Sequence, residues 1–143
     1  MKYNQKTIDH FIREEGYRLT KYLDTTNNWT IGIGHKLTQS ELKSGLSSIT
    51  KEQAYNLLEK DLDVALDGVN RLFPDYNSYP ENTRLALLDM CFNLGYTGLS
   101  GFIITIDLIK KRRFKDAAQQ ALKSKWAQQV PNRAKRVTKL LEG

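Results

Sequence analysis

The spacing of apolar residues changes along this chain, and that change limits the fold more than any other sequence feature. Up to about residue 15 and beyond about residue 50, apolar residues recur at intervals of three and four, as on one face of a helix. Between Tyr17 and His35 they alternate with other residues instead, on both sides of a polar cluster at residues 24–28. We therefore expect a mainly helical protein with one small β-hairpin.

Local signals place the helix ends. A short helix over residues 5–15 is closed by a left-handed cap at Gly16. Thr50 and Gln53 fit a capping box in which each side chain serves a backbone N–H group, so a long helix runs from about 51 to 72. A third short strand at about His35–Leu37 is weakly indicated. Further helices are expected over residues 85–92 before Gly95, 102–109, 114–122 and after Pro131.

The length of 143 residues fits one domain, and no repeat or linker divides it. We expect a hairpin-containing lobe at about 15–50 and a helical lobe at about 70–143, joined by the long helix, with a cleft between the lobes. The longest uncharged stretch, Met90–Ile106, is interrupted by polar residues and glycines, so no membrane-spanning helix is expected. No apolar signal-peptide core follows the first residues, so secretion by the usual route is not expected.

Charge is unevenly distributed. Residues 1–99 carry 11 Lys and Arg against 13 Asp and Glu, whereas residues 100–143 carry 11 against 3, so the two parts have net charges of −2 and +8. This surplus suggests an anionic partner such as nucleic acid, a membrane surface or an acidic wall polymer, although basic faces are more often merely solvated. The basic residues in question are Lys110, Lys111, Arg112, Arg113, Lys115, Arg133, Lys135 and Arg136.

The strongest candidates for a catalytic site are Glu15, Asp24 and Thr30. A hairpin can bring a helix end, a turn and a returning strand together. Two carboxyl groups and a hydroxyl suit glycoside hydrolysis, in which one acid protonates the leaving oxygen and a carboxylate attacks the sugar or activates water. The acid must stay protonated near neutral pH, which apolar surroundings can arrange. On spacing alone, such residues are more often solvated or capping groups.

The residues around Glu15, Asp24 and Thr30 make the interpretation of this set more specific. The relevant stretches are Glu15-Gly16, Leu19, Tyr22, Asp24, Thr30-Ile31-Gly32-Ile33-Gly34-His35, Arg84 to Leu87, Phe92 to Gly95, Thr97-Gly98, Gly101-Phe102, Trp126 and Pro131 to Val137. This pattern covers most of the chain and closely resembles the phage-type lysozymes, the T-even-phage endolysin family. The resemblance implies a lysozyme-like α+β fold. It also implies a muramidase that cleaves between N-acetylmuramic acid and N-acetylglucosamine with inversion and without a cofactor.

The resemblance also assigns catalytic roles. Glu15 matches the general acid of the family, Asp24 its second carboxylate, and Thr30 the residue that helps hold the attacking water. Arg133 matches an arginine near the acid, where its charge would favour the ionised form and burial would have to compensate. Without the family, a solvated position in a basic run is the simpler reading of Arg133.

Other positions follow in the same way. The substrate-binding positions of the family fall on Lys36, Phe92, Thr105 and Gln120, although core packing is the competing interpretation of Phe92. His35 matches a histidine that forms a structural salt bridge with an acid on the long helix, here Asp61. The connection between His35 and Thr50 is shorter than in the most similar family members, which could alter the rim of the cleft.

Metal and nucleotide chemistry have little support. His35 alone would suggest a base or a ligand, but His10 is remote in sequence and Cys91 is a lone cysteine expected to be a buried, inert thiol. No metal site is therefore expected. The run Gly32-Ile33-Gly34 lacks the third glycine of a nucleotide-binding loop, so both glycines are interpreted as hairpin positions.

Two alternatives stay open. One is a catalytically silent module that binds wall or nucleic acid through the basic residues. The other is a lytic transglycosylase, which cleaves the same bond without water and can use one acid; the pair Asp24 and Thr30 disfavours it. The leading reading is a phage or prophage endolysin that causes host lysis. It implies a peptidoglycan substrate, no nucleic acid partner, no membrane insertion and a monomer by default. The protein would be held in the host cytoplasm until a holin-type lesion admits it to the wall in the periplasm.

Overall fold

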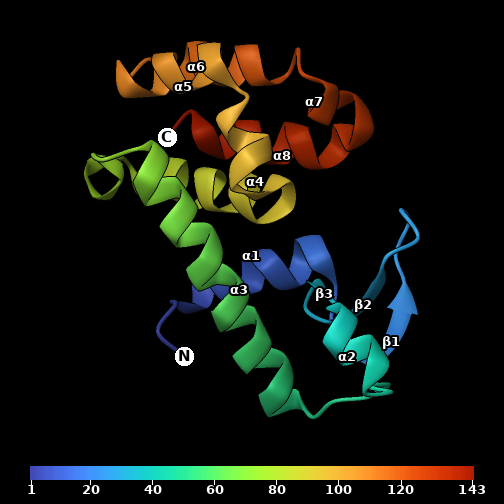
Figure 1. Ribbon diagram of the computed structural model, residues 1–143. Helices are drawn as coiled ribbons and strands as arrows, with labels where there is room; N and C mark the ends of the chain where they lie inside the picture. Colours follow the sequence, from blue (N-terminus) through green and yellow to red (C-terminus); the bar gives the residue numbers. More distant parts are fainter. The chain divides into compact units, whose positions relative to one another are not determined.

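The computed structural model describes all 143 residues and confirms a mainly helical α+β protein with one small antiparallel sheet (Figure 1). The chain forms two compact units, Met1–Leu62 and Asp63–Gly143, and the boundary lies inside the long helix. In order, the elements are α1 (Gln5–Glu15), β1 (Arg18–Leu23), β2 (Trp29–Gly32), β3 (His35–Lys36), α2 (Gln39–Lys43), α3 (Lys51–Leu72), η1 (Tyr76–Ser78), α4 (Glu81–Ser100), α5 (Ile103–Lys110), α6 (Phe114–Ala121), α7 (Lys125–Gln129) and α8 (Pro131–Leu141).

The sheet of the first unit has the order β1-β2-β3, with both pairs antiparallel. Tyr22 pairs with Thr30, and Thr30 pairs with Lys36, so these three side chains share one face of the sheet. The turn between β1 and β2 closes through the Asp24 amide, which donates to the Asn28 carbonyl oxygen at 2.9 Å. The weakly indicated third strand is therefore present, and β3 is one residue shorter than expected.

The outer edge of β1 is occupied as well. The Lys21 amide donates to the Ser47 carbonyl oxygen at 2.9 Å, and the Ile49 amide donates to the Leu19 carbonyl oxygen at 2.8 Å. An isolated bridge pairs Thr20 with Ser48 between these two bonds. The connection from α2 to α3 thus runs along the strand that begins the sheet.

Helix ends follow the local signals closely. The Thr50 amide donates to Gln53 Oε1 at 2.8 Å and the Gln53 amide donates to Thr50 Oγ1 at 3.1 Å, which confirms the capping box. Gly16 ends α1 with a positive φ of 80°, as expected, and its amide donates to the Ile12 carbonyl oxygen. Its ψ of 177° is extended rather than left-handed helical, because the chain passes directly into β1.

The second unit packs around α4, in which residues 85–91 are all buried. Gly95 interrupts this helix with φ 75° and ψ 166°, so the expected break is correct, but helix resumes as far as Ser100. Thr83 Oγ1 donates to the Leu141 carbonyl oxygen at 3.0 Å and ties α4 to the end of α8. The short α7 was not predicted, because its five residues are too few to show a helical period.

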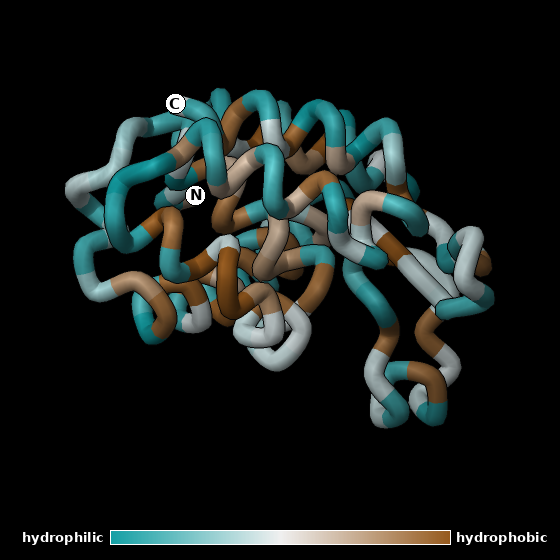
Figure 2. Tube along the Cα trace, turned by 90° about the horizontal axis from the view of Figure 1, so that it is seen from above, coloured by the Kyte–Doolittle hydropathy of each residue, from teal (hydrophilic) through white to brown (hydrophobic).

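Apolar and polar positions alternate at short intervals along the helical coils of Figure 2, as expected for helices with one buried face. No individual helix has both the length and the apolar composition needed to cross a membrane, and only α4 and α5 taken together, with a bend of 108°, reach those limits.

Candidate active site

Glu15 is the last residue of α1 and is half-buried. Its Oε2 atom is shielded from solvent. The C-terminal end of a helix carries partial negative charge, which disfavours a carboxylate there. Burial of a carboxyl oxygen acts in the same direction. Both features of the position favour the neutral acid, which is the form a proton donor needs.

Asp24 lies in a different environment, in the polar turn between β1 and β2. Its Oδ1 accepts three hydrogen bonds: from the Thr26 amide at 2.8 Å, the Thr26 hydroxyl at 2.8 Å and the Asn28 amide at 2.9 Å. Burial raises the pKa of Asp24, but these hydrogen bonds and the charge of Lys36 outweigh it, so the pKa lies below its ordinary value. Asp24 is therefore ionised at neutral pH, and all three bonds go to the same oxygen.

Thr30 is 3% exposed in β2. Its hydroxyl donates to the Asn28 carbonyl oxygen at 2.9 Å, so the hydroxyl proton is already committed. The remaining lone pairs of Oγ1 can accept a hydrogen bond from a water molecule. Thr30 can thus orient a water molecule by accepting a hydrogen bond from it. The oxygen lone pairs of that water stay free for attack.

Tyr22 lies within electrostatic range of both carboxyl groups. Burial raises the pKa of the Tyr22 phenol, and Glu15 and Asp24 raise it further when they are ionised, whereas Arg18 lowers it. The Arg18 guanidinium lies 4.5 Å from the centre of the Tyr22 ring. Both carboxyl groups therefore act on one phenol, and the joining of Glu15 and Asp24 in one site stays a prediction.

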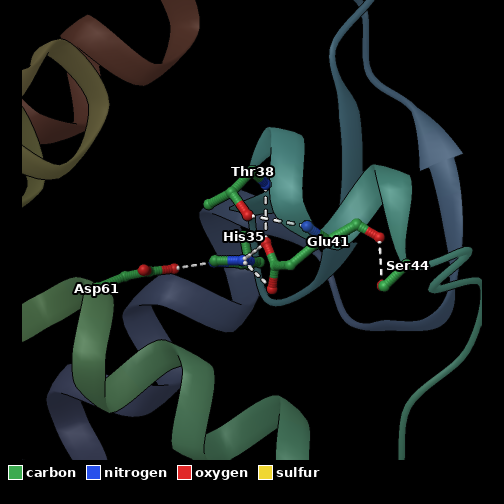
Figure 3. Close-up of polar contacts among 5 residues, drawn as sticks. All are labelled: His35, Thr38, Glu41, Ser44 and Asp61. Atoms are coloured by element: carbon green, nitrogen blue, oxygen red, sulfur yellow. Dashed lines mark hydrogen bonds and ion pairs between the residues drawn. The ribbon is translucent and has the colours of Figure 1, made fainter.

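His35 is held between two acids (Figure 3). Its Nδ1 is 2.8 Å from Asp61 Oδ2, which is the contact implied by the resemblance, and its Nε2 is 2.9 Å from Glu41 Oε1. The hydrogen bond to Asp61 raises the pKa of His35 to about 9, with burial opposing it and Glu41 adding to it. Asp61 and Glu41 contact different ring nitrogens, on opposite sides of the imidazole. The two carboxylates and the imidazole therefore do not point toward one common position, as metal ligands would.

Glu41 was missed by the sequence reasoning. It also closes a capping box at α2, since the Thr38 amide donates to Glu41 Oε1 at 2.7 Å and the Glu41 amide donates to Thr38 Oγ1 at 3.1 Å. The spacing Thr38-x-x-Glu41 is a sequence signal for that helix start. Nothing in that spacing indicates the contact with His35.

Arg133 is not a solvated residue. Its side chain is 10% exposed and donates from Nε to Asp89 Oδ1 at 3.1 Å and from Nη2 to Asp89 Oδ2 at 3.2 Å. Asp89 is completely buried in α4 and was also missed. The position that the resemblance gives Arg133 beside Glu15 stays a prediction.

Two of the expected substrate-binding residues meet in the second unit. Thr105 on α5 and Gln120 on α6 line one pocket of about 310 Å³. Phe92 is half-buried on α4 and does not line it, whereas Lys36 is an exposed residue of the first unit. The rest of the lining consists of Gly101, Phe102, Ile103, Ile104, Lys123 and Ser124.

The structure also shows where Cys91, His10 and the basic run at residues 110–115 lie. Cys91 is 3% exposed, and burial raises the pKa of its thiol, which confirms a buried cysteine that stays protonated. His10 is buried, with its ring packed edge-on against Phe11. The basic run at residues 110–115 is exposed apart from Phe114.

The model of the family described as phage lysozyme matches residues 12–142, and this range includes Glu15, Asp24 and Thr30. The chain belongs to the phage lysozyme family. Like other members, this phage lysozyme is a glycoside hydrolase.

Three relatives show the breadth of the similarity. This phage lysozyme is 31% identical over 151 aligned positions to the probable T4-type lysozyme 2 of Dictyostelium discoideum, covering 90% of this chain and 89% of that protein. It is 33% identical over 106 positions to the endolysin of Salmonella phage P22, covering 71% of this chain and 68% of that protein. It is 28% identical over 159 positions to the pre-baseplate central spike protein of Enterobacteria phage T4, covering 96% of this chain and 28% of that protein.

Proposed function

We propose that this phage lysozyme is a muramidase that hydrolyses the bond between N-acetylmuramic acid and N-acetylglucosamine in peptidoglycan, with inversion. The observation that carries the proposal is the contrast between the environments of two carboxyl groups in the first unit. Glu15 has a shielded oxygen at a helix C-terminus, whereas Asp24 is kept ionised by hydrogen bonds to one of its oxygens. Environments that separate an acid from a base in this way support Glu15 as the acid and Asp24 as the base of a glycosidase.

The reaction assigns one step to each residue. Glu15 gives its proton to the leaving oxygen, and the bond between that oxygen and the anomeric carbon of N-acetylmuramic acid breaks. A water that donates one hydrogen bond to Thr30 Oγ1 and another to Asp24 attacks the same carbon from the opposite face. Asp24 accepts the proton that the water loses. Attack from the opposite face inverts the anomeric centre.

Substrate binding forms the second part of the proposal. The pocket lined by Thr105 and Gln120 offers a hydroxyl and an amide beside apolar side chains, which suits an amphipathic sugar or its substituents. Lys36 in the first unit and Phe92 in the second are also proposed to bind the substrate. The +8 charge of residues 100–143 supports attraction to the anionic wall.

We further propose that the protein acts as an endolysin and lyses the host. On this proposal it is a monomer in the host cytoplasm until a holin-type lesion lets it reach the wall in the periplasm, without inserting into the membrane or binding nucleic acid. The name of the P22 relative, an endolysin, supports this role.

Digestion of purified peptidoglycan with mass analysis of the fragments tests the proposal. Wild type should release fragments with reducing muramic ends, and NMR spectra taken early in the reaction should show the inverted anomer first. Glu15→Gln and Asp24→Asn should each lose most of the activity, whereas Asp67→Asn, an exposed position on α3, should keep it. Anhydromuramic ends would indicate a transglycosylase, and wall left intact by the wild type would favour the binding module.

A further inference from the structure

Gly34 lies against Glu15 at the turn between β2 and β3. Three residues, Gly32 to Gly34, join the paired positions Ile31 and His35. Gly34 has a φ of 70°, which residues with side chains rarely adopt. A Cβ atom at position 34 would lie 2.7 Å from each of three Glu15 atoms, Cβ, Cγ and Oε1. The backbone of Gly34 therefore borders the space in which the Glu15 side chain lies.

Glu15 could not easily move aside to make room for a side chain at position 34. The outer atoms of a glutamate can turn away by rotation about its side-chain bonds, but the position of Cβ is set by the backbone. A methyl group at position 34 would meet the Glu15 Cβ itself. Relief would require the end of α1 or the turn to move.

The turn is anchored on both sides of Gly34. Ile33 is 1% exposed and sits directly before Gly34. His35 follows directly and is fixed by Asp61 on one ring nitrogen and Glu41 on the other. A side chain added at position 34 would therefore displace Glu15 rather than the turn.

We propose that Gly34 is a positioning residue for the proton donor. Because Gly34 has no side chain, its backbone packs directly against Glu15 and helps to fix the position of the carboxyl group. The proposal rests on the proposed role of Glu15 as general acid. General acid catalysis needs hydrogen-bond geometry between the acid and the leaving oxygen, and displacements of about 1 Å at such groups cost roughly a hundredfold in rate. Gly34 acts only through Glu15 and contacts no reacting atom in this proposal.

The test compares Gly34→Ala with Gly45→Ala. Gly45 has a similar φ of 77°, but a Cβ there would have nothing within 4 Å, so it reproduces the backbone strain without the contact. On soluble wall fragments, Gly34→Ala should lower kcat roughly tenfold to a hundredfold with KM nearly unchanged. The alkaline limb of its pH–rate profile should move to lower pH, because a displaced, better solvated carboxyl gives up its proton more readily. Gly45→Ala should leave kcat, KM and the limb unchanged.

Equal kcat values and equal alkaline limbs in the two variants would overturn the proposal. If Glu15→Gln also keeps full activity, the proposed function itself fails; if Glu15→Gln is inactive while Gly34→Ala is unimpaired, only the positioning role fails. The activity of Glu15→Gln therefore shows whether the proposed function or only the role of Gly34 is wrong.

Urea unfolding keeps the proposal testable if Gly34→Ala folds poorly. Glu15→Gly removes all three atoms that the new methyl group would meet. In that background, Gly34→Ala should lower the urea midpoint no more than Gly45→Ala does, and folding lost in the single variant should return. An equal loss in both backgrounds, or a double variant that still does not fold, would show that Glu15 is not what the turn accommodates.

Discussion

The Nδ1 atom of His35 lies 2.8 Å from Asp61 Oδ2, and this contact links the sheet to α3 across 26 positions of sequence. The raised pKa of His35 means that folding increases its affinity for a proton. Stability from this source is complete below about pH 6.5 and is lost as the pH rises through about 9. The contribution is on the order of 3 kcal/mol.

Urea denaturation between about pH 6 and about pH 10 measures this contribution. The wild type should lose free energy of unfolding over this range more steeply than His35→Gln. Glu41→Gln is a useful partial variant, because glutamine can still accept from the Thr38 amide in the capping box while the charge beside His35 is gone. Parallel curves for the wild type and His35→Gln would contradict the assignment.

The buried pair of Arg133 and Asp89 gives a second prediction. Arg133→Met leaves the carboxylate of Asp89 buried without the guanidinium, at a cost of about 3–5 kcal/mol in the free energy of unfolding. Replacing both residues with Arg133→Met and Asp89→Leu should recover part of that loss. Thermal unfolding provides the measurement. Lys139→Ala, at an exposed pair with Glu142, should change little, and a loss there as large as for Arg133→Met would refute the argument from burial.

Local features were predictable from the residue pattern, whereas contacts between separate elements were not, apart from the contact of His35 with Asp61 that the resemblance supplied. The capping box of Thr50 and Gln53 and the end of α1 at Gly16 are visible because their causes lie within a few positions. The contacts of His35 with Glu41 and of Arg133 with Asp89 leave no periodic trace, since each depends on how separate elements pack. The family resemblance supplied Asp61 but neither Glu41 nor Asp89.

The candidate site divides in the same way. Glu15, Asp24 and Thr30 could be predicted as a set because motif and hairpin topology agreed. The closeness of Gly34 to Glu15 could not be predicted, because a glycine in a hairpin is already explained by its φ. The pocket of Thr105 and Gln120 joins two helices and needed the fold before it could be recognised.

The hydrogen bonds around Asp24 predict the acid side of the pH profile. Thr26→Ala removes the hydroxyl that donates to Asp24 Oδ1 and leaves the amide bond in place. The pKa of Asp24 should rise, so the acid limb of kcat/KM should move to higher pH. Thr25→Ala, its exposed neighbour, serves as the control. The assignment of this limb to Asp24 is wrong if both variants keep the wild-type profile.

The pocket in the second unit predicts an effect on binding. Gln120→Ala removes an amide from the lining, so KM for wall fragments should rise severalfold with a smaller change in kcat. Gln119→Ala is a matched control, because this neighbouring glutamine is exposed and does not line the pocket. Steady-state kinetics with soluble fragments distinguishes them, and equal KM values would exclude Gln120 from the binding surface.

Charge predicts how binding to intact wall depends on salt. Lys110 and Lys115 are exposed in the basic second unit, so replacing both with glutamate should weaken sedimentation with purified wall at low salt and flatten its salt dependence. The same change at Lys43 and Lys60, exposed lysines of the first unit, should have a smaller effect. Binding by the wild type that does not change with salt would refute the electrostatic contribution.

The segment beside β1 also covers a strand edge that would otherwise be unpaired. An unpaired strand edge can recruit a strand from another molecule and begin aggregation. Here the Ser47 carbonyl and the Ile49 amide occupy one edge of the sheet, and the other edge is only the two residues of β3. A short loop thereby leaves the sheet that carries Thr30 without a long unpaired edge, although its hairpin exposes Leu23 and Trp29.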